Sequence, residues 1–157
     1  MAAKEEALIK ARLFFDQFPW DKVQHAYGQA TDSPDYLYVL IDQDKNNEDI
    51  TEDIVNDYLY ARPWHQWDVY SSTPYAIQCV LYIIENVDVS HLKTIDRPLI
   101  YSFFHFIEIC THGAKTDETL REEITKGLST YQRFQNHPNS YVKESVGKLI
   151  KFCKENK

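Results

Sequence analysis

Glycine is scarce in this chain of 157 residues, which contains only four. Sheets built from many tight turns rely on glycine where φ must be positive, so its scarcity disfavours an all-β fold. The six prolines lie at the borders of segments with helical periodicity, where proline does not interrupt a helix. The sequence therefore predicts an all-α protein.

Long apolar runs are also missing. No segment approaches the roughly 18 apolar residues of a membrane-spanning helix, and the first residues, Met-Ala-Ala-Lys-Glu-Glu, lack the apolar region of a secretory signal. The three cysteines, Cys79, Cys110 and Cys153, occupy apolar helical positions. An odd number of such cysteines predicts buried, reduced thiols. We expect a cytoplasmic protein that has no contact with a membrane.

Basic residues are outnumbered by acidic ones. The chain has 17 Lys and Arg against 24 Asp and Glu, which gives a net charge of −7 and a pI near 5.3. General nucleic-acid binding needs a basic surface, so this balance disfavours it. The charge instead favours a protein partner with a basic surface.

The segment from Trp64 to Asn86 organises the rest of the chain. Its first half is predicted to be a polar, aromatic loop, and its second half a helix with Thr73 as N-cap and Pro74 at the first helical position. Apolar residues recur on two faces of this helix, at Ala76, Cys79, Val80, Ile83, Ile84 and Val87 and at Ile77 and Leu81. A helix that is apolar on two faces must be covered on two sides, so we expect it at the centre of the fold.

Periodicity and capping residues predict six further helices within one domain spanning residues 1–157. Their approximate ranges are 4–18, 33–44, 48–62, 98–113, 116–131 and 140–154. The interval from Pro34 to Pro74 equals that from Pro98 to Pro138, and each interval contains two helices. This spacing predicts helix pairs at about 33–62, 71–112 and 116–154, with the first helix as a cap. Stacked antiparallel pairs of this kind form a short right-handed α-solenoid.

Short motifs in the first half of the chain carry a resemblance to a known family. They are Trp20-Asp21, His25-Ala26-Tyr27-Gly28 with Ala30-Thr31-Asp32 and Pro34, and His65-Gln66 with Tyr70 and Thr73-Pro74. Together they resemble bacterial HEAT-like repeat proteins over about residues 20–85, except that Trp67 stands where this group usually has glycine. The resemblance implies an α-solenoid used for protein binding. Short proteins of this kind often resemble immunity proteins, which neutralise a toxin made from a neighbouring locus.

Two motif loops, about 25–34 and 64–73, are expected to hold the fold together. Their structural residues are predicted to be His25, Tyr27, Gly28, His65, Gln66 and Tyr70. Imidazole and phenol groups in such loops usually fasten the backbone by hydrogen bonds, and replacing a buried His65 by alanine should then lower stability by about 1–3 kcal/mol. The alternative is a small enzyme in which His25, Tyr27 and His65 perform acid–base chemistry.

Acidic residues are concentrated between Asp32 and Asp57, where nine acids accompany a single base, Lys45. One interpretation is an ordinary solvated surface with acids near a helix N-terminus. The other is a docking surface for a basic partner, anchored by exposed loop tryptophans. The predicted partner-binding residues are Asp42, Asp44, Glu48, Asp49, Glu52, Asp53, Trp64 and Trp67.

Catalytic signatures are absent from the sequence. It contains no glycine-rich phosphate loop and no nucleophile elbow, and its His, Cys and acidic residues lack the spacing of a metal site. We therefore expect no enzyme activity, cofactor or metal. The predicted function is that of an immunity protein which neutralises a cognate toxin, and the alternative is a scaffold or adaptor that recruits a basic domain.

Overall fold

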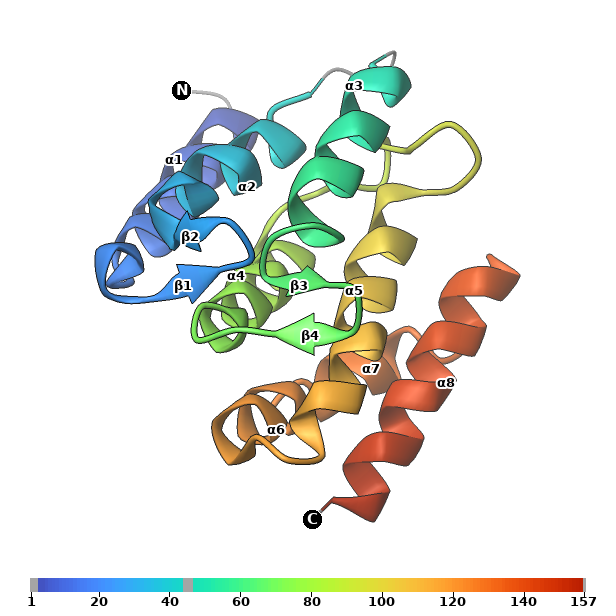
Figure 1. Cartoon of the computed structure of the whole chain (residues 1–157). Helices are drawn as coiled ribbons and strands as arrows, with labels where there is room; N and C mark the ends of the chain where they lie inside the picture. Colours follow the sequence, from blue (N-terminus) through green and yellow to red (C-terminus); the bar gives the residue numbers. More distant parts are fainter. Residues whose placement is uncertain (1–2, 44–46, 157) are drawn as a thin grey trace.

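The computed structural model describes residues 3–43 and 47–156 and is mostly helical (Figure 1). Its α-helices are α1 (Ala3–Asp16), α2 (Ser33–Ile41), α3 (Glu48–Ile54), α4 (Thr73–Asn86), α5 (Leu99–Ala114), α6 (Glu118–Thr125), α7 (Leu128–Arg133) and α8 (Ser140–Glu155). Two 3₁₀ turns, η1 (Trp20–Lys22) and η2 (Ala30–Asp32), and a π-helical turn, η3 (Val55–Leu59), complete the helical structure. The prediction of a mainly helical fold is confirmed.

Helix α4 lies at the centre of the fold, as its two apolar faces predict. Its side chains at Ile77, Cys79, Val80 and Ile83 are fully buried, and it contacts α1, α2, α5, α6 and α7. The thiols of Cys79, Cys110 and Cys153 are buried on α4, α5 and α8 and form no disulfide. Helices α1 and α2 cover one side of α4, and α5 and α6 cover the other (Figure 1).

Two predicted helices differ from the structure. The segment 116–131 divides into α6 and α7 at Gly127, because the buried Tyr131 side chain turns back to donate its hydroxyl proton to the Ile124 carbonyl, 2.7 Å away. A β-carbon at Gly127 would lie 2.5 Å from that hydroxyl oxygen. The segment 48–62 is α-helical only to Ile54 and continues as the wider η3 turn.

The predicted N-cap at Thr73 is wrong. Thr73 is the first residue of α4 and follows Ser72, which caps the helix without a side-chain hydrogen bond. The Thr73 hydroxyl instead donates to the Pro63 carbonyl and accepts from the Tyr70 backbone N–H at 2.7 Å. Thr73 therefore closes the loop that precedes the helix. Ser33 holds the equivalent first position in α2.

The two expected polar loops contain short β-hairpins. Strand β1 (Gln24–His25) pairs with β2 (Gly28–Gln29), and β3 (Trp64–His65) pairs with β4 (Asp68–Val69). Each hairpin leads into a helix that carries proline near its first residue, so the two segments repeat one local design. Strands of two residues are too short to produce the alternation that identifies strands in a sequence.

The second hairpin lies directly against α5 because α5 carries glycine at the point of contact. A β-carbon at Gly113 would lie 2.5 Å from a methyl carbon of Val69 in β4. Such a distance is impossible without movement, so the missing side chain sets how closely the hairpin approaches the helix.

We predict that Gly113→Ala lowers the free energy of unfolding by about 1–2 kcal/mol, because overpacking outweighs the gain in helix propensity. The matched control is Gly147→Ala on α8, where a new β-carbon meets nothing within 4 Å. That control should raise stability by about 0.5–1 kcal/mol. Chemical denaturation measures both changes, and equal effects at the two positions would contradict the proposed contact.

Candidate protein-binding face

The two hairpins lie side by side and are joined by main-chain hydrogen bonds. The Ala26 N–H donates to the Arg62 carbonyl, and the Ser72 N–H donates to the Gln24 carbonyl, both at 3.0 Å. The Gln24 N–H donates to the Ser71 hydroxyl at 2.8 Å. We call the outer surface formed by Tyr27, His65, Gln66, Trp67 and the neighbouring His112 the hairpin face.

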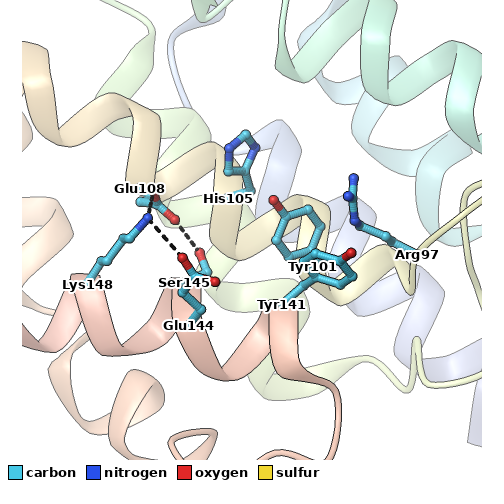
Figure 2. Close-up of a pocket in the computed structure, with 8 residues that line it drawn as sticks. All are labelled: Arg97, Tyr101, His105, Glu108, Tyr141, Glu144, Ser145 and Lys148. Carbon is cyan, nitrogen blue, oxygen red and sulfur yellow. Dashed lines mark hydrogen bonds and ion pairs between the residues drawn. The ribbon is translucent and has the colours of Figure 1, made fainter.

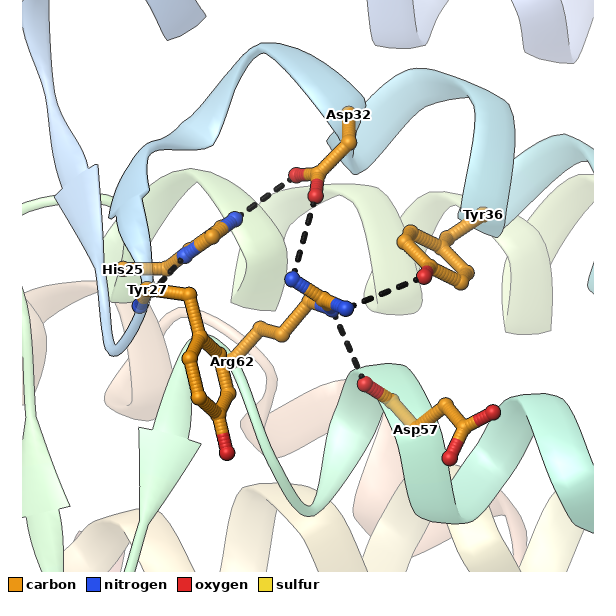
Figure 3. A network of polar contacts seen from close by, with 6 residues as sticks. All are labelled: His25, Tyr27, Asp32, Tyr36, Asp57 and Arg62. Carbon is orange, nitrogen blue, oxygen red and sulfur yellow. Dashed lines mark hydrogen bonds and ion pairs between the residues drawn. The ribbon is translucent and has the colours of Figure 1, made fainter.

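A buried histidine fastens the first hairpin (Figure 3). The Tyr27 N–H donates to His25 Nδ1 at 3.0 Å, so the ring proton lies on Nε2, which donates to an Asp32 carboxylate oxygen at 2.7 Å. His25 thereby connects the hairpin turn to the start of α2. With both ring nitrogens engaged, His25 offers no free base for acid–base chemistry.

Arg62 connects this cluster to the end of the α3–η3 helix (Figure 3). Its guanidinium donates to Asp32 at 3.3 Å, to the Tyr36 hydroxyl at 3.1 Å and to the Asp57 carbonyl at 3.0 Å. The same group lies 5.1 Å from the ring centroid of Tyr27 and 5.0 Å from that of Tyr36. Sequence reasoning missed this role of Arg62, and the only available signal was an arginine directly before Pro63.

His65 differs from the sequence expectation of a buried, well-bonded group. It is half-buried, and its imidazole has one long contact, 3.5 Å from Nε2 to the Tyr27 hydroxyl. Tyr27 itself is 63% exposed. Of the two histidines, His25 therefore fastens its loop by buried hydrogen bonds, and His65 is part of the surface.

The remaining predicted motif residues lie in or beside the hairpins. Gly28 has φ of +117°, a backbone conformation that side chains disfavour. Tyr70 follows β4 and is partly exposed, and burial raises the pKa of its hydroxyl. Gln66 is exposed at the tip of the second hairpin.

Trp67 is the most unusual residue of the hairpin face. It has φ of +73° and follows Gln66 with φ of +48°, so both central turn residues adopt the left-handed conformation. Such a conformation in a bulky residue is a genuine outlier that costs about 1–3 kcal/mol. Trp67 is nevertheless 60% exposed, so the indole is held at the surface and only partly buried.

Neighbouring aromatic rings hold Trp67 in place. Its indole makes edge-to-face contacts with the ring of Trp64 and with the ring of His112 in α5. The ring centroids are 5.4 Å and 6.0 Å apart, respectively. Trp64 is half-buried behind it. A hollow of about 680 Å³ opens beside Trp67, between β4 and the segment that joins α5 to α6. An exposed, supported tryptophan beside a hollow is typical of a binding anchor.

The predicted acidic residues lie mainly on α3, at the opposite end of the α3–η3 helix from the second hairpin (Figure 1). Asp42, Asp49 and Asp53 are exposed, whereas Glu48 is half-buried and lies 3.7 Å from Lys93. Glu52 is also half-buried and lines a cavity beside α5, which corrects its expected place on an exposed face. Asp44 lies outside the described residues.

A second hollow, of about 310 Å³, lies between α2 and α3. Its lining is Asp32, Asp35, Tyr36, Val39 and Ile54. Its lining is mostly apolar, and its two carboxylates already have partners, Asp32 with Arg62 at 3.3 Å and Asp35 with Arg12 at 2.7 Å. Tyr36 also receives the hydrogen bond from Arg62, so this acidic groove adjoins the hairpin face.

Other kinds of site receive no support from the described residues. Within residues 3–43 and 47–156, no three His, Cys, Asp or Glu residues gather as metal ligands would. No helix in the same ranges has the length and apolarity needed to cross a bilayer. Comparison with family models, curated proteins and solved structures finds no match to this chain.

We predict that His25→Ala lowers the free energy of unfolding by about 2–3 kcal/mol, because it leaves the Tyr27 N–H without its partner and removes the shorter of the two hydrogen bonds to Asp32. The control is His65→Ala, which removes one weak contact and should cost less than about 1 kcal/mol. Urea denaturation of both variants measures the difference. A larger loss for His65→Ala would contradict the assigned hydrogen bonds.

Proposed function

We propose that this chain is a non-enzymatic protein-binding module of the immunity type, which neutralises a cognate toxin in the cytoplasm by occupying a basic surface on it. The single observation that carries the binding function is Trp67, held exposed at a hairpin tip in a strained conformation. Strain of this kind persists where the surrounding structure imposes it, and it is concentrated at functional sites.

The first hairpin avoids such strain by placing glycine in its turn. There the single residue with positive φ is Gly28, whereas the second hairpin places Gln66 and Trp67 in this conformation. Glycine or asparagine would serve the same turn at lower cost. We therefore attribute the tryptophan at the tip to contacts between its indole and a binding partner.

The acidic groove supports a basic partner. Asp49 and Asp53 are exposed on α3, the helix that contributes Ile54 to the groove, so a partner side chain could be buried in the groove while its basic neighbours meet these carboxylates. Toxins that act on nucleic acid are basic where they hold phosphate. Complementary charge would raise the association rate, and the buried anchors would supply affinity.

The helix contacts support a short α-solenoid of HEAT-like pairs as the scaffold. Helix α4 contacts α6, and α5 contacts α8, as expected when successive pairs stack in parallel layers. The end of η3 faces α5, where the Tyr60 hydroxyl lies 3.0 Å from His105 Nδ1. In this proposal α1 caps the stack, the first hairpin connects α1 to α2, and the second connects η3 to α4.

We predict that Trp67→Gly preserves the melting temperature or raises it, because relief of backbone strain offsets the lost ring contacts. The same change should weaken partner binding by about 2 kcal/mol or more, as for a central anchor. The test co-expresses the variant with the product of a neighbouring open reading frame and measures both cell survival and affinity. The control is Leu13→Ala, which removes an exposed apolar side chain from α1. Full protection by the Trp67→Gly variant would exclude the hairpin face.

We also predict that the double change Asp49→Lys and Asp53→Lys slows association with the partner about tenfold or more at low salt, with a smaller effect at high salt. Stopped-flow binding measures this change. The control reverses the exposed Glu5 and Glu6 of α1, where we expect no comparable effect. Equal rates for both double variants would remove the exposed acids of α3 from the binding surface.

The same surface would also serve an adaptor that recruits a basic domain. The two functions differ in consequence, because only an immunity protein must protect a cell from killing. A partner that binds through Trp67 but is not toxic when expressed alone would favour the adaptor.

A further inference from the structure

A separate cavity of about 240 Å³ lies between α5 and α8 (Figure 2). Arg97, Tyr101 and Tyr141 gather at one end, and Glu108, Glu144 and Lys148 gather at the other. His105 of α5 lies between the two groups. None of these residues belongs to the hairpin face or to the acidic groove.

Arg97 is held in place by aromatic rings but has no carboxylate partner. Its guanidinium carbon lies 4.2 Å from the ring centroid of Tyr141 and 5.3 Å from that of Tyr101. Within the described residues, no Asp or Glu oxygen lies at ion-pair distance from it, and its Nε atom is buried without a hydrogen-bond partner. By contrast, Arg12, Arg62 and Arg133 each pair with a carboxylate.

An unsatisfied buried donor on a charged group is costly, and a bound anion would lower that cost. A guanidinium presents two parallel N–H groups that match a carboxylate. Tyr101 can supply a further donor, because a tyrosine hydroxyl is protonated at neutral pH and burial raises its pKa further. This end of the cavity is therefore suited to a single carboxylate.

The opposite end of the cavity is suited to a cation. Glu108 and Glu144 share one ammonium group, that of Lys148, at 3.7 Å and 3.4 Å. Glu108 also accepts a hydrogen bond from the Ser145 hydroxyl at 2.8 Å. Burial lowers the pKa of His105, so at neutral pH the imidazole adds no positive charge between the ends. Two carboxylates and one ammonium leave a net negative charge, which disfavours ligands with several negative charges.

We propose that this cavity binds a small zwitterion, with its carboxylate on Arg97 and its ammonium group at Glu108 and Glu144. Tyr101, beside Arg97, and Glu108 are seven residues apart in α5, which is about 10 Å at about 1.5 Å of rise per residue. Their side chains shorten this span, so the two charges of the ligand must be separated by several bonds. Amino acids with a long methylene chain and short peptides with a basic residue have this form. The proposal is independent of the protein-binding function.

The test uses 8-aminooctanoate, octanoate and octylamine as probes, which share one chain length and differ in their charged ends. Isothermal titration of the whole protein should give the tightest binding for 8-aminooctanoate, with about tenfold weaker binding when either charge is missing. Equal affinity for octanoate and 8-aminooctanoate would overturn the role of the acidic end. Inorganic phosphate that binds more tightly than all three would overturn the assignment of a zwitterion.

The variants Arg97→Gln and Arg133→Gln form a matched pair, since both arginines lie over an aromatic ring but only Arg133 pairs with a carboxylate. Arg97→Gln should weaken 8-aminooctanoate binding about tenfold or more, and Arg133→Gln should leave it unchanged. Arg97→Lys retains the charge and provides a second test if the glutamine variant fails to fold. It should bind more weakly than the native protein, because lysine lacks the two parallel N–H groups. Native affinity in a folded Arg97→Gln variant would overturn the proposal.

Discussion

The hydrogen bonds of Arg62 are the interaction on which the arrangement of this surface depends. One guanidinium connects Asp32 at the start of α2, Tyr36 within α2 and the Asp57 carbonyl in η3. Asp32 in turn accepts the proton of the buried His25. The first hairpin, α2 and the end of the α3–η3 helix are therefore fixed by a single polar cluster. Such clusters stabilise only when nearly every member is satisfied, so they impose one geometry on the segments that they join.

That geometry explains how the second hairpin retains its strain. Main-chain hydrogen bonds tie the region around β3 and β4 to the first hairpin, and the close contact of Val69 with Gly113 ties β4 to α5. With both sides of the hairpin held, Gln66 and Trp67 have little freedom to relax toward negative φ. The strain at the tip is thus balanced by contacts elsewhere in the structure, and under the proposed function the indole would bind with little ordering cost.

Sequence patterns predicted what depends on local periodicity. The central position of α4, the approximate helix ranges and the burial of the cysteines followed from apolar spacing and proline positions. The hairpins did not, because two paired residues leave no alternation to detect. Trp67 is unusual because of its positive backbone φ angle, which a sequence does not show directly. The only sign in the sequence was that the resembling family usually has glycine at this position. The clusters around Arg62 and Arg97 join segments far apart in the chain, such as Arg97 and Tyr141, so they could be found only once the helices were placed.

The burial of the three thiols has a practical consequence. Burial raises the pKa of Cys79 and Cys110 well above the usual value and that of Cys153 to about 11, so almost no thiolate exists at neutral pH. Alkylating reagents attack the thiolate, and therefore react only when a segment opens. Because the cysteines lie on α4, α5 and α8, each reports on a different helix. The alkylation rate of each cysteine would thus measure how often its own helix opens, without any added probe.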